Sequence, residues 1–295
     1  MASPAYATYV DDEEIIEHAP SVIRLTRDLA NAARTMGPKE ARFLVDAYYT
    51  SQENRKRAAN QIRAMARGVV VEEDAGEVLT TPEPHVLIDW LFNQSRILES
   101  QIKRALDTYT TAHIMGSWMR QIVGIGPVIS AGILAHLEVP RPTAGHINSF
   151  VGWAAADQKP WKAGQVRPFN VQLKTICWHA GQSFMKLSNR EDCFYGRKYR
   201  ERKAFEQMMS DTGKRVETAK EWLPRFAKDT PTYKHYAEGR LPPSQIDARA
   251  RRWAVKLFLS HMNEVWLIRT GQASPVPYPI GHLHHVDYIP PPIPA

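Results

Sequence analysis

Helical spacing of the apolar residues is the feature that most limits what this chain can fold into. From Ser21 to Leu106 apolar side chains recur three or four positions apart, as at Leu44 and Tyr48, and no alternating run typical of a strand occurs. Such spacing places apolar side chains on one face of a helix. The pattern therefore predicts helices and no sheet in this part of the chain.

Two long antiparallel helices are expected within residues 1–110. The acidic stretch from Gly68 to Glu83 lacks periodicity and is interpreted as the loop between them. Thr81-Pro-Glu-Pro opens the second helix, because proline suits a first helical turn. One side of that helix is lined by Leu87, Leu91, Gln94, Leu98 and Ile102.

The rest of the chain is also interpreted as helical, which gives an all-α, multi-helix fold class. Residues 111–190 form a central unit, and residues 191–272 form a basic helical region with helices at 195–209 and 214–226. Its last helix is expected to begin at Ser244, with Asp247 completing a capping box, and to stop at Gly271. Residues 273–295 are rich in proline and are interpreted as a docked strap or a loose tail.

An excess of positive charge points to a polyanionic partner. The formal net charge is +7 at pH 7, so DNA is the first expected partner and RNA the second. No apolar run approaches the roughly 18 to 20 residues that span a bilayer, so no membrane partner is expected. The acidic N-terminus is unlike a secretory signal, and only two cysteines occur, so we expect a cytoplasmic protein.

The segment from Ile122 to His136 predicts a helix-hairpin-helix element. Gly124 and Gly126 permit a tight turn, and Pro127 suits the first turn of the following helix. Backbone amides at such a helix N-terminus can hold a phosphate oxygen without reading base sequence. The predicted contacts are Gly124, Ile125, Gly126 and Val128. The alternative is that Gly-Ile-Gly-Pro is only a tight turn that packs two helices.

From Gln121 to about Lys186 the chain resembles the C-terminal domain of a family of insertion-sequence transposases. The matching pieces are the hairpin IVGIGPVISAGILAHL, the step Phe150-Val-Gly-Trp-Ala, and Phe169-Asn-Val-Gln-Leu-Lys at the start of a helix. That family joins a RuvC-like nuclease domain to a helix-hairpin-helix domain with a catalytic serine. The resemblance implies engagement of DNA and a role in DNA transposition or recombination.

Two departures bear on catalysis. Where the family has a Ser-Gly pair whose serine attacks DNA, this chain reads Ala163-Gly164, and alanine has no nucleophile. The family's acidic metal ligands lie on β-strands, whereas residues 1–110 here have helical spacing. Ser183 is the fallback nucleophile, since a helix would place His179 and Lys186 on the same face. An amphipathic helix also offers such trios without any catalytic role, so the question of whether the chain is an enzyme stays open.

Further basic residues are predicted to contact DNA phosphates. For each group a solvated charged face is the alternative interpretation. The groups lie in a proline-bounded loop, in the stretch that follows Cys193, and on the last helix: Lys162 and Arg167; Arg197, Arg200 and Arg202; Arg249, Arg252 and Lys256.

No cofactor or metal ion is expected, because His282, His284 and His285 lack the paired spacing of a zinc motif. Three hypotheses remain open at this point. The first is a DNA-binding protein, the second is a recombinase with an unrecognised site, and the third is a non-enzymatic assembly protein whose hairpin is a packing motif. A homo-oligomer is expected, with the N-terminal helices forming the dimer contact in the third case.

Overall fold

The computed structural model describes residues 31–67, 86–153, 164–274, 276, 278–281 and 287–293. Every regular element in these ranges is helical, so the predicted all-α class is confirmed. None of the helices in these ranges is both long and apolar enough to cross a membrane.

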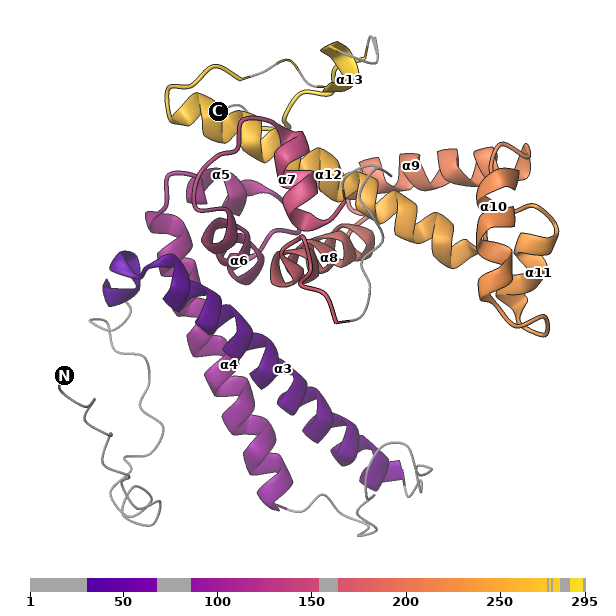
Figure 1. Cartoon of the computed structure of the whole chain (residues 1–295). Coiled ribbons are helices and arrows are strands. Elements are labelled where there is room, and N and C mark those ends of the chain that lie inside the picture. The colour runs from indigo at the N-terminus through magenta and orange to yellow at the C-terminus, as the bar shows by residue number, and fades with distance from the viewer. Residues whose placement is uncertain are drawn as a thin grey trace.

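Two long helices project from the rest of the molecule as an antiparallel pair (Figure 1). They are α3 (Pro38–Arg67) and α4 (Val86–Ala112), and the short 3-10 helix η1 (Ala33–Thr35) precedes them. Arg55 of α3 donates to Glu99 of α4 at 2.5 Å. At the base of the pair, Ala41 and Leu106 enter the main core. The pair is therefore anchored at one end and reaches outward at the other.

The outer part of α4 leaves apolar side chains in solvent. Leu87, Leu91 and Leu98 of the predicted stripe are exposed, and Trp90 beside them is also exposed. Ile102 alone among the apolar stripe residues is buried. α3 thus covers a different side of α4 from the one that carries these leucines.

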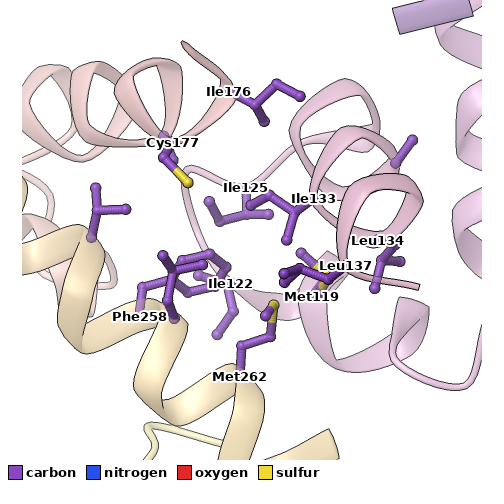
Figure 2. Close-up of a cluster of buried hydrophobic side chains, with 14 of the residues drawn as sticks. Met119, Ile122, Ile125, Ile133, Leu134, Leu137, Ile176, Cys177, Phe258 and Met262 are labelled. Carbon is purple, nitrogen blue, oxygen red and sulfur yellow. The ribbon is translucent and has the colours of Figure 1, made fainter. Parts of the chain in front are cut away.

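The centre of the body is α6 (Pro127–Leu137), which follows α5 (Gly116–Gln121). α6 is apolar on all sides and every residue in it except Ile129 is buried, as expected for a core helix. Small residues let its neighbours approach closely: a Cβ on Gly132 would lie 2.7 Å from Ile176. Ile122 and Ile125 lie in the same cluster of buried side chains as Ile133 (Figure 2).

Four further helices surround this centre: α7 (Ala144–Val151), α8 (Val171–Lys186), α9 (Phe194–Asp211) and α12 (Pro243–Arg269). α12 crosses the body and packs against both α8 and α9 (Figure 1). Phe258 on α12 contacts the rings of Trp118, Phe184 and Tyr195. Helices from distant parts of the sequence therefore share one aromatic core.

A smaller hydrophobic cluster lies at the far end of α9 and α12. It contains Ala219, Tyr236, Leu241 and Ile246. The elements that supply it are α10 (Val216–Trp222), the 3-10 helix η3 (Leu223–Arg225) and α11 (Pro231–Ala237). The helix predicted over 214–226 is thus split, since Pro224 supplies no amide to continue it. α11 was not predicted.

The capping box predicted for the last helix is wrong. α12 begins at Pro243 and its N-cap, Pro242, has no side-chain cap. Asp247 instead accepts a hydrogen bond from the Tyr199 hydroxyl and pairs with Arg251. The predicted end is close, because α12 stops at Arg269 and Gly271 has a φ of +73°.

The described part of the C-terminal region contacts the body. The short helix α13 (Tyr278–Gly281) precedes it. Trp118 Nε1 donates to the Ile293 carbonyl at 2.9 Å, and His261 Nε2 lies 2.8 Å from the Ile289 carbonyl. Burial lowers the pKa of His261 to about 4, so the ring is neutral and its Nδ1 accepts from the Tyr195 hydroxyl. Residues 287–293 therefore contact the body, and we call them the strap.

Candidate nucleic-acid interface

A backbone hydrogen bond stabilises the turn between α5 and α6. The Ile125 amide donates to the Ile122 carbonyl at 2.9 Å, and Gly124 has a φ of +100°, which favours glycine. Gly126 precedes α6 as an extended N-cap. The side chains of Ile122 and Ile125 point into the core (Figure 2).

The two glycines of the turn have different surroundings. A Cβ on Gly124 would lie 3.1 Å from Phe184 and 3.3 Å from Ser183 Oγ, so this position is pressed against α8. A Cβ on Gly126 would meet nothing within 4 Å. The backbone hydrogen bonds outside the helices include none from the Gly126 or Val128 amide in the part of the chain that the structure describes. Val128 and Ile125 have buried side chains, so Gly126 is the more open predicted contact.

A cavity of about 730 Å³ lies beside this turn. Residues 121–123 border it, together with Arg197 and Lys198 of α9 and the strap residues 288–293. Two carboxylates, Glu191 and Asp192, also line it. Arg197 is thus the one predicted arginine placed at the hairpin, and it shares the cavity with negative charge.

Ser183 lies next to the turn, but the expected trio does not form a hydrogen-bonded base and nucleophile. The His179 ring stacks on Tyr49 with centroids 4.3 Å apart. Burial, followed by Lys56, lowers the pKa of His179. Among the side-chain hydrogen bonds of the described ranges, none joins Ser183 to His179. Ser183 therefore has no partner here that would remove its proton.

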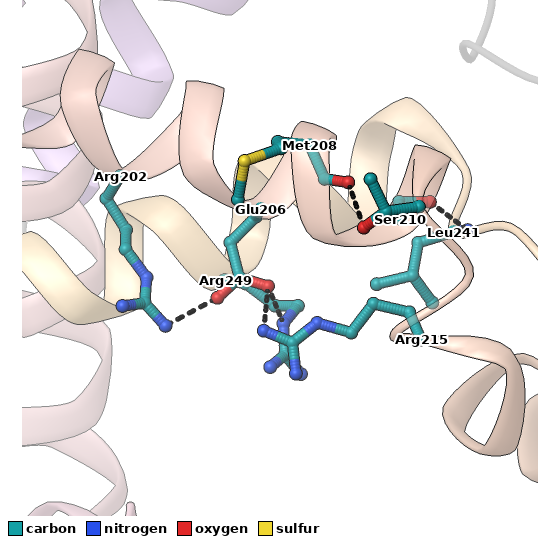
Figure 3. A network of polar contacts seen from close by, with 8 residues as sticks. Arg202, Glu206, Met208, Ser210, Arg215, Leu241 and Arg249 are labelled. Atoms are coloured by element: carbon teal, nitrogen blue, oxygen red, sulfur yellow. Dashed lines mark hydrogen bonds and ion pairs between the residues drawn. The ribbon is translucent and has the colours of Figure 1, made fainter.

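Three arginines gather around one buried carboxylate, Glu206 (Figure 3). Arg202, Arg215 and Arg249 lie 2.6, 2.7 and 2.8 Å from its oxygens. Burial alone would raise the pKa of Glu206, but the hydrogen bonds and charges of the arginines outweigh it and the pKa is lowered. We call these four residues the Glu206 network. Two predicted DNA contacts, Arg202 and Arg249, are thus partly neutralised within the protein.

A second group of cations has a different environment. Lys174 of α8 and Arg252 and Lys256 of α12 form what we call the cationic cluster. Lys256 Nζ donates to the Trp153 carbonyl at 2.8 Å, and Lys174 Nζ lies 3.5 Å from the Gly152 carbonyl. No ion pair joins any of the three to a carboxylate among the residues described. The carbonyl groups of Gly152 and Trp153, just past α7, are therefore the described partners of the two lysines.

Burial and, after it, neighbouring cations lower the pKa of each member of the cluster. Burial, then Arg252 and Arg167, lowers the pKa of Lys174. Burial, then Arg252, likewise lowers the pKa of Lys256. The side chain of Arg252 is exposed, but the protein around it partly desolvates the guanidinium group. This burial lowers the pKa of Arg252, and the charge of Arg249 lowers it further. The charge of Arg252 thus disfavours the charged forms of both lysines, and an added anion would favour them.

Aromatic side chains lie against the cluster. Lys174 Nζ sits 4.3 Å from the centroid of the Phe169 ring. A shallow cavity of about 390 Å³ is lined by Arg167, Phe169, Val171, Lys174, Thr175 and Trp178. The N-terminus of α8 opens here, capped by the Asn170 side chain, which accepts from the Leu173 amide at 2.8 Å. Its helix dipole adds to the positive potential.

The predicted contacts therefore fall into separate places. Arg252, Lys256 and Arg167 come together near Lys174, whereas Gly124 lies at the other end of α8, beside Ser183. Lys174 and Ser183 are nine positions apart on α8, which corresponds to a rise of roughly 13 Å along the helix axis. Arg200 is exposed on α9, and Lys162 and Ala163 lie outside the described residues.

Sequence reasoning missed Lys174 and Trp178. Both occur in the stretch that carries the resemblance, and their spacing of four places them on one helix face. A cation and an aromatic residue at this spacing, in the first half of a helix, were the available signal.

The described ranges hold no group of three or more His, Cys, Asp or Glu that could bind a metal ion. His282, His284 and His285 lie outside the described residues. Cys177 is fully buried, and burial raises the pKa of its thiol.

Comparison with known protein families, characterised proteins and solved structures found no match to this chain.

Proposed function

We propose that the protein binds DNA through the phosphate backbone, with the cationic cluster as the main contact. The observation that carries the proposal is the contrast in charge compensation. Arg202, Arg215 and Arg249 share a carboxylate, whereas in the described ranges Lys174 and Lys256 contact carbonyl oxygens and Arg252 has no ion pair with a carboxylate. Cations that gather without a counter-charge are suited to an anion from outside.

Gly126 and Arg197 extend the proposed contact surface. The Gly126 amide can donate to a phosphate at the start of α6, and Arg197 is exposed across the adjoining cavity. Since these residues lie at the opposite end of α8 from the cluster, one DNA molecule would have to run along this helix to reach both. The transposase resemblance supports the same type of partner.

Salt dependence of duplex binding tests the proposal. In a variant carrying Lys174→Gln, Arg252→Gln and Lys256→Gln, the slope of log affinity against log salt should fall by about 2.7, or about 0.9 for each lost phosphate contact. The matched control removes the same charge at exposed sites: Lys214→Gln, Lys228→Gln and Lys234→Gln. Equal losses in both variants would mean that net charge alone attracts DNA, and the proposal would fail.

The proposal covers binding of DNA, with transposition or recombination as the process that the resemblance suggests. Incubation with supercoiled plasmid and a divalent metal ion should give neither nicks nor a covalent adduct, because Ser183 lacks a hydrogen-bonded base. An adduct that Ser183→Ala abolishes would instead support the recombinase hypothesis.

A second candidate function is self-assembly through α4. The observation that favours it is the exposed apolar surface formed by Leu87, Trp90, Leu91, Ile97 and Leu98 on the projecting helix pair. Contiguous exposed apolar side chains mark interaction sites. A second copy of the chain would offer the same surface, as a two-fold symmetric interface requires.

Oligomeric mass separates this candidate from the first. Leu91→Asp with Leu98→Asp should convert a dimer to a monomer in light scattering while duplex binding per chain persists. The control places aspartate at two exposed apolar sites away from the stripe, Ile114 and Val166. A chain that is monomeric before any substitution would remove the assembly candidate.

A further inference from the structure

Trp178 is an exposed aromatic side chain with no role in the core. Its side chain is 53% exposed, whereas Trp118 and Trp266 are buried in the main cluster. Among the residues described, its ring makes an edge contact with His179, with centroids 5.1 Å apart. Packing therefore does not account for a large indole at this position.

The position of Trp178 relative to the cationic cluster is specific. It lies one helical turn after Lys174 on α8, and both line the same shallow cavity with Phe169. Side chains four residues apart on a helix are neighbours, with Cβ atoms about 6 Å apart. An ammonium group and an open aromatic face thus adjoin each other at one side of the cavity.

This arrangement matches the two parts of a nucleotide. The phosphate would supply the negative charge that the cluster does not receive from a carboxylate in the described ranges. The base is a flat ring that can stack on an indole. A base inside a duplex is stacked on both faces and paired, so it cannot reach Trp178 unless it leaves the helix. The cavity is shallow, which suits a base that is splayed out beside its own backbone.

We propose that Trp178 is a stacking platform for an unpaired base of single-stranded DNA whose phosphate is held by the cationic cluster. The inference rests on the proposed function, because the cluster must first hold the backbone. It goes further in naming the form of DNA that this end of α8 selects.

Paired affinity measurements on single-stranded and duplex DNA test the inference. Trp178→Ala should weaken binding of a short oligothymidine about tenfold, because one base stack contributes on this scale. Duplex binding should change less than twofold, and Trp178→Phe should restore most of the loss. Phe43→Ala is the control, since Phe43 is an aromatic side chain that is 72% exposed but lies on α3.

An abasic oligonucleotide separates stacking from charge. On a strand without bases, wild type and Trp178→Ala should bind alike. Equal affinity of the two proteins for oligothymidine would overturn the inference, as would an equal loss on the abasic strand.

The two proposals fail in different ways. If the triple cluster variant binds duplex as wild type does, the proposed function fails. If that variant loses binding while Trp178→Ala does not, only the stacking inference fails.

Discussion

Arg249 and Arg252 lie three residues apart on α12 and have opposite surroundings. Arg249 reaches Glu206 and shares it with two other arginines. Arg252 faces Lys174 and Lys256 and has no carboxylate partner in the ranges described. Within one helical turn, α12 thus passes from an arginine that pairs with a buried carboxylate to an arginine that has no carboxylate partner among the described residues.

This difference shows how a basic sequence divides into structural and functional charge. The Glu206 network ties α9 to α12 and to the start of α10, so it stabilises the fold by joining three segments. The cationic cluster brings like charges together, which opposes folding. A cluster that costs stability is more readily explained by a ligand than by the fold.

The largest expected effect comes from removing the shared carboxylate. Glu206→Gln should lower the free energy of unfolding by about 3 kcal/mol, the low end for a broken buried ion pair, because the arginines keep partial contact with solvent. Urea unfolding measures it. Glu201→Gln is the control, since this carboxylate is 61% exposed in its pair with Lys198 and should cost about 0.5 kcal/mol or less.

Duplex affinity of the folded Glu206→Gln variant sharpens the comparison. It should equal or exceed that of wild type, because Arg202 and Arg249 are released from their partner. A clear loss of affinity with the fold intact would show that the two groups of cations are not separate in function.

Acidification should change the free energy of unfolding by an amount between the largest and the smallest of these effects. The pKa of Glu206 is lowered from 4.5, so its contribution to stability is complete above pH 4.5 and is lost as the pH falls through the lowered folded value. The difference in unfolding free energy between wild type and Glu206→Gln should therefore be constant near neutral pH and shrink below pH 4.5. Urea midpoints measured across this range test the sign. A difference that grows in acid would contradict the network.

Local pattern was enough to predict the helices that bury long apolar stripes. The predicted bounds, 244–271, match α12 to within two residues at each end, because apolar residues recur three or four positions apart between Ile246 and Val265 and Gly271 ends the helix. α11 has only seven residues and packs through Tyr236 on a small separate cluster, so it offers too little periodicity.

The division of the cations could not be predicted, because it depends on contacts between distant residues. Glu206 lies 43 positions before Arg249, and nothing in the local sequence distinguishes Arg249 from Arg252 as its partner. Asp247 shows the same effect, since Tyr199, 48 positions away, contacts the carboxylate expected to cap α12. Local sequence therefore picks out the basic residues but does not show which of them pair with carboxylates inside the protein.

The smallest expected effect is a gain in the free energy of unfolding, in contrast to the loss expected for Glu206→Gln. Arg252→Gln should raise the free energy of unfolding by about 0.5 kcal/mol, because it removes a positive charge that repels Arg249 and Lys256, which lie three and four residues away on the same helix. The same substitution should weaken duplex binding and reduce the salt slope by about 0.9. Thermal unfolding beside the salt titration measures both. Loss of stability in Arg252→Gln would mean that this arginine also serves the fold, and the contrast with Arg249 would disappear.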